Sequence, residues 1–271
     1  AHNEAAVIGR SLTRLYQGIW HDEIDVLVVC NGCTDDTAAR ARTAVRNVRV
    51  LEIGRPSKAE AMRVGNSLST VFPRVHLDAD VVLSGDDLRR LVEPLQDESL
   101  LAVSPRRALV TAHSSVVVRW YYDVWQHLPQ VEAGLFGRGA IALSAEGQSR
   151  VDSLPAVMSD DLAASEAFRP EERRVVDEAV VFVRAPHHLA DLVRRRIRVA
   201  TGNAQADAVG ARRSESVTTW RDLARLAVTH PGLLPKLPVF LGVTAVSRLL
   251  ARRRVRTGDF TTWQRDESSR A

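Results

Sequence analysis

The chain has 271 residues, of which 45% are hydrophobic and 26% are charged, and its formal net charge at pH 7 is +4. This length allows a sizeable core in one large domain or two small ones, and fifteen glycines and eleven prolines do not suggest disorder. Two cysteines do not imply a disulfide framework, so a cytoplasmic location is expected. The sequence begins with a polar cluster, AHNE, and we expect a first strand upstream of it.

Apolar runs and helical patterns alternate over the first hundred residues. Residues 25–30, 48–51 and 75–77 predict strands, and residues 36–44, 58–69 and 86–95 predict helices. This alternation predicts an α/β fold with a mostly parallel sheet flanked by helices. Ligands of such sheets bind at the carboxyl ends of the strands. The three polar clusters that follow these strands, NGCTDD, GRPSK and DAD, are therefore expected to converge on one edge.

The second half of the chain has a less regular pattern. Residues 101–110, 137–144 and 173–183 predict strands, and residues 115–127, 159–168 and 187–203 predict helices. The last of these helices is strongly basic, with Arg194, Arg195, Arg196 and Arg198 spread around it. Arginine forks match phosphate oxygens, so at least one is expected to face an anionic ligand. A solvated helix face is the alternative for any single arginine cluster.

The segment 206–271 predicts a helical tail of different character. Residues 232–250 are largely apolar and are followed by ARRRVR. The run is long enough for a membrane span, but Pro235, Lys236, Pro238 and Arg248 disfavour one. We expect a surface-lying amphipathic helix in peripheral membrane contact, at the inner face of the cell membrane. Packing on the domain or on a second copy, as a homodimer, is the alternative.

Two aspartates, Asp78 and Asp80, stand one residue apart at the end of the third predicted strand. Carboxylate oxygens suit hard cations such as Mg²⁺ or Mn²⁺, which share their other positions with waters and substrate phosphates. On its own such a motif is common, and turn capping is the better explanation of it. Its place on the same edge as the other polar clusters favours a metal that bridges to a diphosphate.

Other candidates each have a structural alternative. Asp35 either accepts hydrogen bonds from a base or ribose or caps the following helix together with Thr34. Lys58 either reaches a phosphate or is solvated, and Asp161 is either a general base or a favourable charge at a helix start. A redox pair formed by Cys30 and Cys33 is the weakest of these readings.

Taken in order, these motifs resemble a family 2 glycosyltransferase with the GT-A fold. The similar segments are AHNEAAVIGRSL, NGCTDDTAARA, KAEAMRVGN, LDAD, GRGAIALS, SDDLAASEAF and RRRIRV. The resemblance covers roughly residues 1–205 and implies a nucleotide-binding half, about 1–100, and an acceptor half, about 101–205. Arg195 and Val199 stand where the family's Gln-x-x-Arg-Trp element has Gln and Trp, which argues against a long processive channel.

The resemblance implies a metal-dependent inverting transfer from a nucleoside-diphosphate sugar to an acceptor hydroxyl. Asp161 is then the catalytic base, and Asp80 ligates Mn²⁺ or Mg²⁺. The implied donor-binding residues are Ala1, Asn3, Glu4, Asn31, Asp35, Lys58, Asp78, Arg195 and Arg198, and the acceptor-side residues are Gly137, Arg138, Gly139 and Asp160.

Two other functions stay open on the sequence. A nucleotidyltransferase that makes nucleotide sugars also uses carboxylate-bound magnesium, although AHNEAAVIGR does not resemble its Gly-rich opening loop. A non-catalytic module that binds a sugar or nucleotide is the second. Nucleic-acid binding is not expected, because the arginines are not interleaved with aromatic residues.

Overall fold

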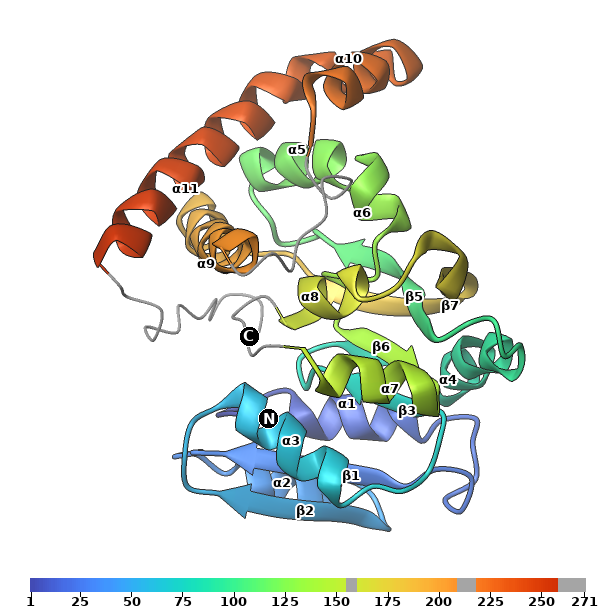
Figure 1. Cartoon of the computed structure of the whole chain (residues 1–271). Coiled ribbons are helices and arrows are strands. Elements are labelled where there is room, and N and C mark those ends of the chain that lie inside the picture. The colour runs from blue at the N-terminus through green and yellow to red at the C-terminus, as the bar shows by residue number, and fades with distance from the viewer. Residues whose placement is uncertain (155–159, 209–217, 258–271) are drawn as a thin grey trace.

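The computed structural model describes residues 1–154, 160–208 and 218–257. In Figure 1 the N-terminal elements form one end of the molecule, and the C-terminal helices lie at the other. The predicted helix start at Ser159 and residues 209–217 and 258–271 of the predicted tail lie outside the described residues.

The N-terminal elements follow the predicted alternation closely. In chain order they are α1 (Ile8–Leu15), β1 (Val26–Asn31), α2 (Thr37–Ala44), β2 (Val48–Ile53), α3 (Lys58–Ser67), β3 (Arg74–Leu77), β4 (Val82–Leu83), α4 (Gly85–Val92) and a short 3₁₀ helix, η1 (Glu93–Gln96). Two helices begin at serine caps, because Ser57 accepts from Glu60 N and Ser84 from Asp87 N. Helix α1 was not predicted, although its Ile8, Leu12 and Leu15 form one buried face.

The remaining elements complete the sheet and add a helical region. They are β5 (Ala102–Val110), α5 (Val116–Trp125), α6 (Pro129–Ala133), β6 (Ala140–Leu143), α7 (Ala145–Asp152), α8 (Asp160–Glu166), η2 (Pro170–Glu172), β7 (Arg173–Arg184), α9 (Leu189–Ala208), α10 (Trp220–Thr229), η4 (Pro231–Lys236) and α11 (Leu237–Thr257). The predicted boundary at residue 205 lies inside α9, and the division into a domain and a tail stays a prediction.

The strand pairing is mixed rather than mostly parallel, which corrects the expectation for the sheet. Strands β1 and β2 form a parallel pair, and a second sheet has the order β3-β6-β5-β7-β4. In that sheet only β5 and β7 pair in parallel, and β6 runs antiparallel to both β3 and β5. The sequence pattern failed here because β3 takes its partner from residues 140–143, far along the chain, and apolar periodicity carries no information on strand direction.

Helix α11 packs against α5 and α9 along one face and leaves the other exposed (Figure 1). Phe240, Val243, Ser247 and Ala251 are buried, whereas Val246 and Leu249 are exposed. By length and composition alone, the segment Pro231–Arg254 is long and apolar enough to cross a membrane, with a mean hydropathy of 1.5. Packing on the domain, one of the alternatives left open, is therefore observed for one face of the helix.

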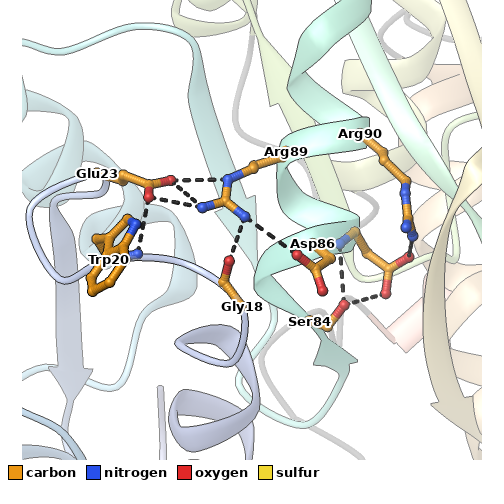
Figure 2. A network of polar contacts seen from close by, with 8 residues as sticks. Gly18, Trp20, Glu23, Ser84, Asp86, Arg89 and Arg90 are labelled. Atoms are coloured by element: carbon orange, nitrogen blue, oxygen red, sulfur yellow. Dashed lines mark hydrogen bonds and ion pairs between the residues drawn. The ribbon is translucent and has the colours of Figure 1, made fainter.

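An arginine anchors the loop after α1 to helix α4 (Figure 2). The Arg89 guanidinium donates to both oxygens of Glu23, at 3.0 and 2.8 Å, and also to the carbonyl of Gly18. Glu23 in turn accepts from Trp20 N at 3.1 Å. This network fixes α4 against the N-terminal elements.

Gly139 closes the junction between β3 and β6, and we expect Gly139→Ala to destabilise the protein. Its φ is +70°, and an added Cβ would lie 2.4 Å from a methyl group of Val81, which is buried. Strain of this kind costs about 1–3 kcal/mol of unfolding free energy, measurable by thermal or denaturant unfolding. The matched change Gly242→Ala, in α11 with no atom within 4 Å of the added Cβ, should be neutral or stabilise by about 0.5–1 kcal/mol. Equal losses in the two variants would contradict this account.

Candidate active site

A large cavity of about 1380 Å³ borders the carboxyl end of β3 and extends to the C-terminal helices. Its polar lining brings together residues from β3, α3, α8 and α9: Lys58, Asp78, Asp80, Asp161, Arg195 and Arg198. Asp80 thus faces the same cavity as Lys58, as expected for strand-end clusters that meet at one edge.

Asp78 is fixed at the end of β3 by two contacts. Its backbone N–H donates to the carbonyl of Gly139 at 2.8 Å, and its Oδ1 accepts from Lys58 Nζ at 3.1 Å. Burial raises the pKa of Asp78, but the charges of Lys58 and Arg198 outweigh this effect, so its pKa lies below the ordinary value. Asp78 therefore stays ionised at neutral pH and carries negative charge at the cavity wall.

Arg198 on α9 lies within electrostatic range of three carboxylates. Burial and the neighbouring Arg195 lower the pKa of Arg198, whereas Asp161, Asp78 and Asp80 raise it. The three acidic residues come from two segments about eighty positions apart in the sequence, the end of β3 and the start of α8. One guanidinium therefore marks the place where the predicted metal-binding, donor-binding and catalytic residues meet.

Asp161 stands in the first turn of α8, and two backbone N–H groups hold its carboxylate. Its Oδ2 accepts from Gly137 N at 2.8 Å, and its Oδ1 accepts from Leu162 N at 2.8 Å. The side chain remains exposed at the cavity. A carboxylate oxygen has two lone pairs, so these hydrogen bonds orient the group without excluding protonation. The side chain of Asp160 lies outside what the structure describes.

The aspartates at the end of β3 fit a divalent cation that shares its coordination with a ligand. Asp78 and Asp80 supply the oxygen donors that Mg²⁺ and Mn²⁺ prefer. Among the described residues, no group of three or more His, Cys, Asp or Glu side chains could hold a metal ion on its own. One or two carboxylates suffice where substrate phosphates and waters complete the shell.

The opening loop divides into residues that face the cavity and residues that support it. Ala1, Glu4 and Asn31 line the cavity, and the carbonyl of Ala1 accepts from both Asn31 N and Asn31 Nδ2, at 2.9 Å each. Asn3 does not line it; its side chain accepts from Thr34 N at 2.7 Å. These residues therefore join the opening loop to the loop after β1.

Asp35 is likewise absent from the cavity wall. Its carboxylate accepts from Thr37 N at 3.1 Å, from the Thr37 hydroxyl, and from Ala5 N at 3.2 Å. Of the two roles left open by the sequence, the observed contacts are those of a cap for α2 that also ties down the opening loop.

Two of the three predicted residues of the glycine-flanked segment line the cavity, namely Gly137 and Gly139. Arg138 between them is buried, and its guanidinium donates to the carbonyls of Gly134, Pro105, Val131 and Glu132. Burial lowers the pKa of Arg138 to about 10. Arg138 therefore braces the loop and does not face the cavity.

The sequence analysis missed two arginines on the sheet. Arg107 on β5 donates to the carbonyl of Gly137 at 3.0 Å and stacks on Trp125, with Cζ 4.3 Å from a ring centroid. Burial, with the charges of Arg138 and Arg195, lowers the pKa of Arg107 to about 9. Arg184 at the end of β7 lines the cavity. The available signal for both was an arginine next to an apolar stretch of a strand, in RALV for Arg107 and in VVFVR for Arg184.

The cysteine pair does not have the surroundings of a reactive thiol. Cys30 is buried in β1, and burial followed by the nearby Cys33 raises its pKa to about 11. Since the thiolate is the reactive form, these surroundings disfavour redox chemistry at Cys30.

Comparison with known proteins gives one family match, over the first half of the chain, and a group of similar folds. Residues 1–130 match the family model of glycosyl transferase family 2. The mannosyltransferase PcManGT from Pyrobaculum calidifontis, solved with GDP-Man and Mn²⁺, is similar at 24% identity and a TM-score of 0.63, over 95% of this chain and 77% of that one.

A second group of similar structures comes from Mycobacterium tuberculosis. Glucosyl-3-phosphoglycerate synthase, solved with Mn²⁺, UDP and phosphoglyceric acid, shares 21% identity over 79% of this chain and 78% of that one, with a TM-score of 0.54. No curated protein sequence matches the chain. At these identities the structural likeness shows the fold, which is GT-A, and the predicted α/β class with flanking helices is confirmed.

Proposed function

Since residues 1–130 match the family model of glycosyl transferase family 2, we propose that this enzyme moves a sugar from a nucleoside-diphosphate sugar to an acceptor hydroxyl with inversion. The observation that carries the proposal is the meeting of Asp78, Asp80 and Asp161 around Arg198 at one cavity. The complexes of the similar structures with GDP-Man or UDP support a nucleotide-bound donor.

The donor side of the cavity is assigned to residues of the first half of the chain and of α9. Ala1, Glu4 and Asn31 line the part next to β1, where we place the nucleoside. Lys58, Arg195 and Arg198 bring positive charge to the same cavity, where the diphosphate accumulates charge as the bond to the sugar breaks. Fixed charges aimed at a developing anion are among the largest contributions to catalysis.

We assign the metal to the end of β3, with Asp80 as its direct ligand and Asp78 next to the ribose or to metal-bound water. The Mn²⁺ in the similar structures supports this assignment, and Mg²⁺ has the same ligand preference. A bound divalent ion would neutralise charge on the departing nucleoside diphosphate.

Asp161 is assigned as the general base that takes the proton of the acceptor hydroxyl. The hydrogen bonds from Gly137 N and Leu162 N orient its carboxylate without protonating it. An acceptor between Asp161 and the donor would attack the anomeric carbon from the face opposite the leaving group, and the configuration would invert.

A donor screen tests the proposed function. The protein is incubated with Mn²⁺ and with UDP-, GDP- and dTDP-sugars in turn, and free nucleoside diphosphate and transferred sugar are both measured. Release of nucleoside diphosphate from at least one donor is the expected result. Release of pyrophosphate from a nucleoside triphosphate would identify a nucleotidyltransferase instead, and donor binding without turnover would identify a binding module.

We propose further that the exposed face of α11 contacts an anionic lipid surface, which would place the enzyme at the inner face of the cell membrane. Leu249 is 56% exposed and Val246 is 49% exposed, and the same helix carries the exposed Arg248, Arg252 and Arg253. Apolar side chains flanked by arginines suit the interface of a membrane with anionic lipids.

Leu249→Asp should reduce co-sedimentation with vesicles of phosphatidylcholine and phosphatidylglycerol at least about tenfold, because it places a charge on the inserted face. Leu68→Asp, at a residue of similar exposure (48%) after α3, is the control and should bind as the unchanged protein does. A concentration-dependent dimer that Leu249→Asp dissociates, without vesicle binding, would show that a second copy covers this face.

A further inference from the structure

The cavity has a second polar region between α5, α9 and α11, away from the acidic residues at the end of β3. Tyr121 of α5, Arg196 of α9, and Thr244 and Ser247 of α11 all line it. Tyr121 stacks on Phe240 of α11, with ring centroids 5.2 Å apart, which brings the two helices together at this point. None of these four side chains takes part in the proposed transfer.

Three buried hydroxyl groups of this region lack a hydrogen bond of normal geometry. They belong to Tyr121, Thr244 and Ser247, although the Tyr121 hydroxyl lies close enough to Thr244 and Arg196 to interact with both within the described part of the chain. Tyr121 is fully buried, and Ser247 is 2% exposed. Leaving a buried polar group unpaired costs about 1–3 kcal/mol, so three in one region are unexpected unless they serve a ligand.

The positions of Thr244 and Ser247 on α11 also favour a ligand-binding role. Phe240, Thr244, Ser247 and Ala251 follow one another at helical spacing and form the face that packs towards α5 and α9. A face that only had to pack would be apolar throughout. Two hydroxyl residues in its middle, next to a cavity, therefore indicate binding rather than packing.

The guanidinium of Arg196 lies beside these hydroxyl groups. Arg196 Cζ lies 5.8 Å from the ring centroid of Tyr121 and 6.0 Å from that of Trp125. Within the described residues, Arg196 has no carboxylate at salt-bridge distance, unlike Arg194 in the same turn, which pairs with Asp191. Burial raises the pKa of the Tyr121 hydroxyl, so this group stays protonated at neutral pH and remains able to donate.

We propose that Arg196, Tyr121, Thr244 and Ser247 form an acceptor subsite that binds a phosphate monoester. All four side chains can donate hydrogen bonds, and a phosphate monoester presents three terminal oxygens to accept them. A guanidinium fork suits two of those oxygens, and the hydroxyls would be satisfied on binding. The subsite would thus hold the acceptor through its phosphate.

The assignment of this phosphate to the acceptor rests on the proposed function. Arg196 and Arg198 stand two positions apart in α9 and point to different sides of the helix, and Arg198 interacts with Asp161. Both arginines and Asp161 line the same cavity, so a molecule that extends along the cavity wall can reach from the subsite towards the assigned base.

Calorimetric titration with inorganic phosphate tests the subsite directly. The unchanged protein should bind phosphate saturably, and Arg196→Gln should weaken binding about 10- to 100-fold, because it removes charged hydrogen bonds. Arg119→Gln, an exposed arginine on α5, is the matched control and should leave the affinity unchanged. Lys58→Ala tests whether phosphate binds on the donor side instead, because it should weaken only phosphate that binds there. Binding that is lost in Lys58→Ala but kept in Arg196→Gln would overturn the proposal, as would an absence of binding.

The double variant Thr244→Val, Ser247→Ala separates a binding role from a structural one. If the hydroxyls serve a ligand, their removal should leave the Tm unchanged or raise it, because unpaired buried groups are lost, while phosphate affinity falls at least about tenfold. A lower Tm with unaltered phosphate affinity would show a structural role and would refute the subsite.

Two sources of the phosphate are distinguished with further probes. Glucose 6-phosphate represents a soluble monoester, and vesicles of phosphatidylcholine with phosphatidic acid represent a lipid one. Binding of either that depends on Arg196 supports the subsite and identifies its source, whereas binding of both to Arg196→Gln without loss contradicts it. The proposed transfer itself is judged separately by nucleoside diphosphate release, so the two proposals can fail independently.

Discussion

Replacing Asp161 with asparagine is expected to reduce sugar transfer by about 10²–10⁴-fold, the usual contribution of a well-placed general base, and to leave donor affinity nearly unchanged. The asparagine has almost the same shape and keeps one carbonyl oxygen for the N–H of Gly137 or Leu162. It cannot take a proton from the acceptor. The loss should therefore fall on kcat and not on the binding of the nucleoside diphosphate.

The measurement pairs steady-state transfer with calorimetric binding of the nucleoside diphosphate in the presence of Mn²⁺. Asp86→Asn provides a matched control, because Asp86 is also an exposed aspartate in the first turn of a helix, but it belongs to the Arg89 network of α4 (Figure 2). That variant should retain transfer. Unaltered transfer in Asp161→Asn would remove Asp161 from the mechanism, and equal losses of transfer and donor affinity would reveal a purely structural role.

The elements that local sequence determines were predicted well. The first three strands are found where short Val- and Leu-containing segments precede a polar cluster, and α3 and α4 begin within one residue of their predicted starts, at serines that cap them. Capping and apolar periodicity depend on a few adjacent residues, so one sequence suffices to read them. Lys58, Asp78 and Asp80 follow predicted strands, and their meeting at one cavity was therefore also expected from the sequence.

Features set by distant parts of the chain were not predictable in the same way. The antiparallel entry of β6 beside β3 depends on a pairing across more than sixty residues, and the pattern of AIAL is equally compatible with either direction. Arg138 was expected on the acceptor side because GRGAIALS resembles the glycine-flanked segment of family 2 glycosyltransferases. Only the fold shows that four backbone carbonyls converge on its guanidinium.

Asp80→Ala is expected to abolish the part of donor affinity that depends on a divalent ion. In the unchanged protein, Mn²⁺ should tighten the binding of the nucleoside diphosphate about 10- to 100-fold, which corresponds to about 1.4–2.8 kcal/mol. In Asp80→Ala the affinities with and without Mn²⁺ should become equal, because a direct carboxylate ligand is lost. Calorimetry with and without Mn²⁺ measures this difference without any transfer reaction. Asp97→Ala, an exposed aspartate after η1, should keep the full effect of Mn²⁺.

Asp78→Ala should give a different result, because Asp78 is also the ion-pair partner of Lys58 at 3.1 Å. Loss of that carboxylate frees Lys58 to meet the diphosphate, so metal-independent affinity should rise while the effect of Mn²⁺ declines. The two aspartates are thus distinguished by the binding measured without metal: unchanged in Asp80→Ala, stronger in Asp78→Ala. If Asp80→Ala retained the full response to Mn²⁺, the ion would have to be held elsewhere, and the carboxylates at the end of β3 would be left with the capping role that the sequence also allowed.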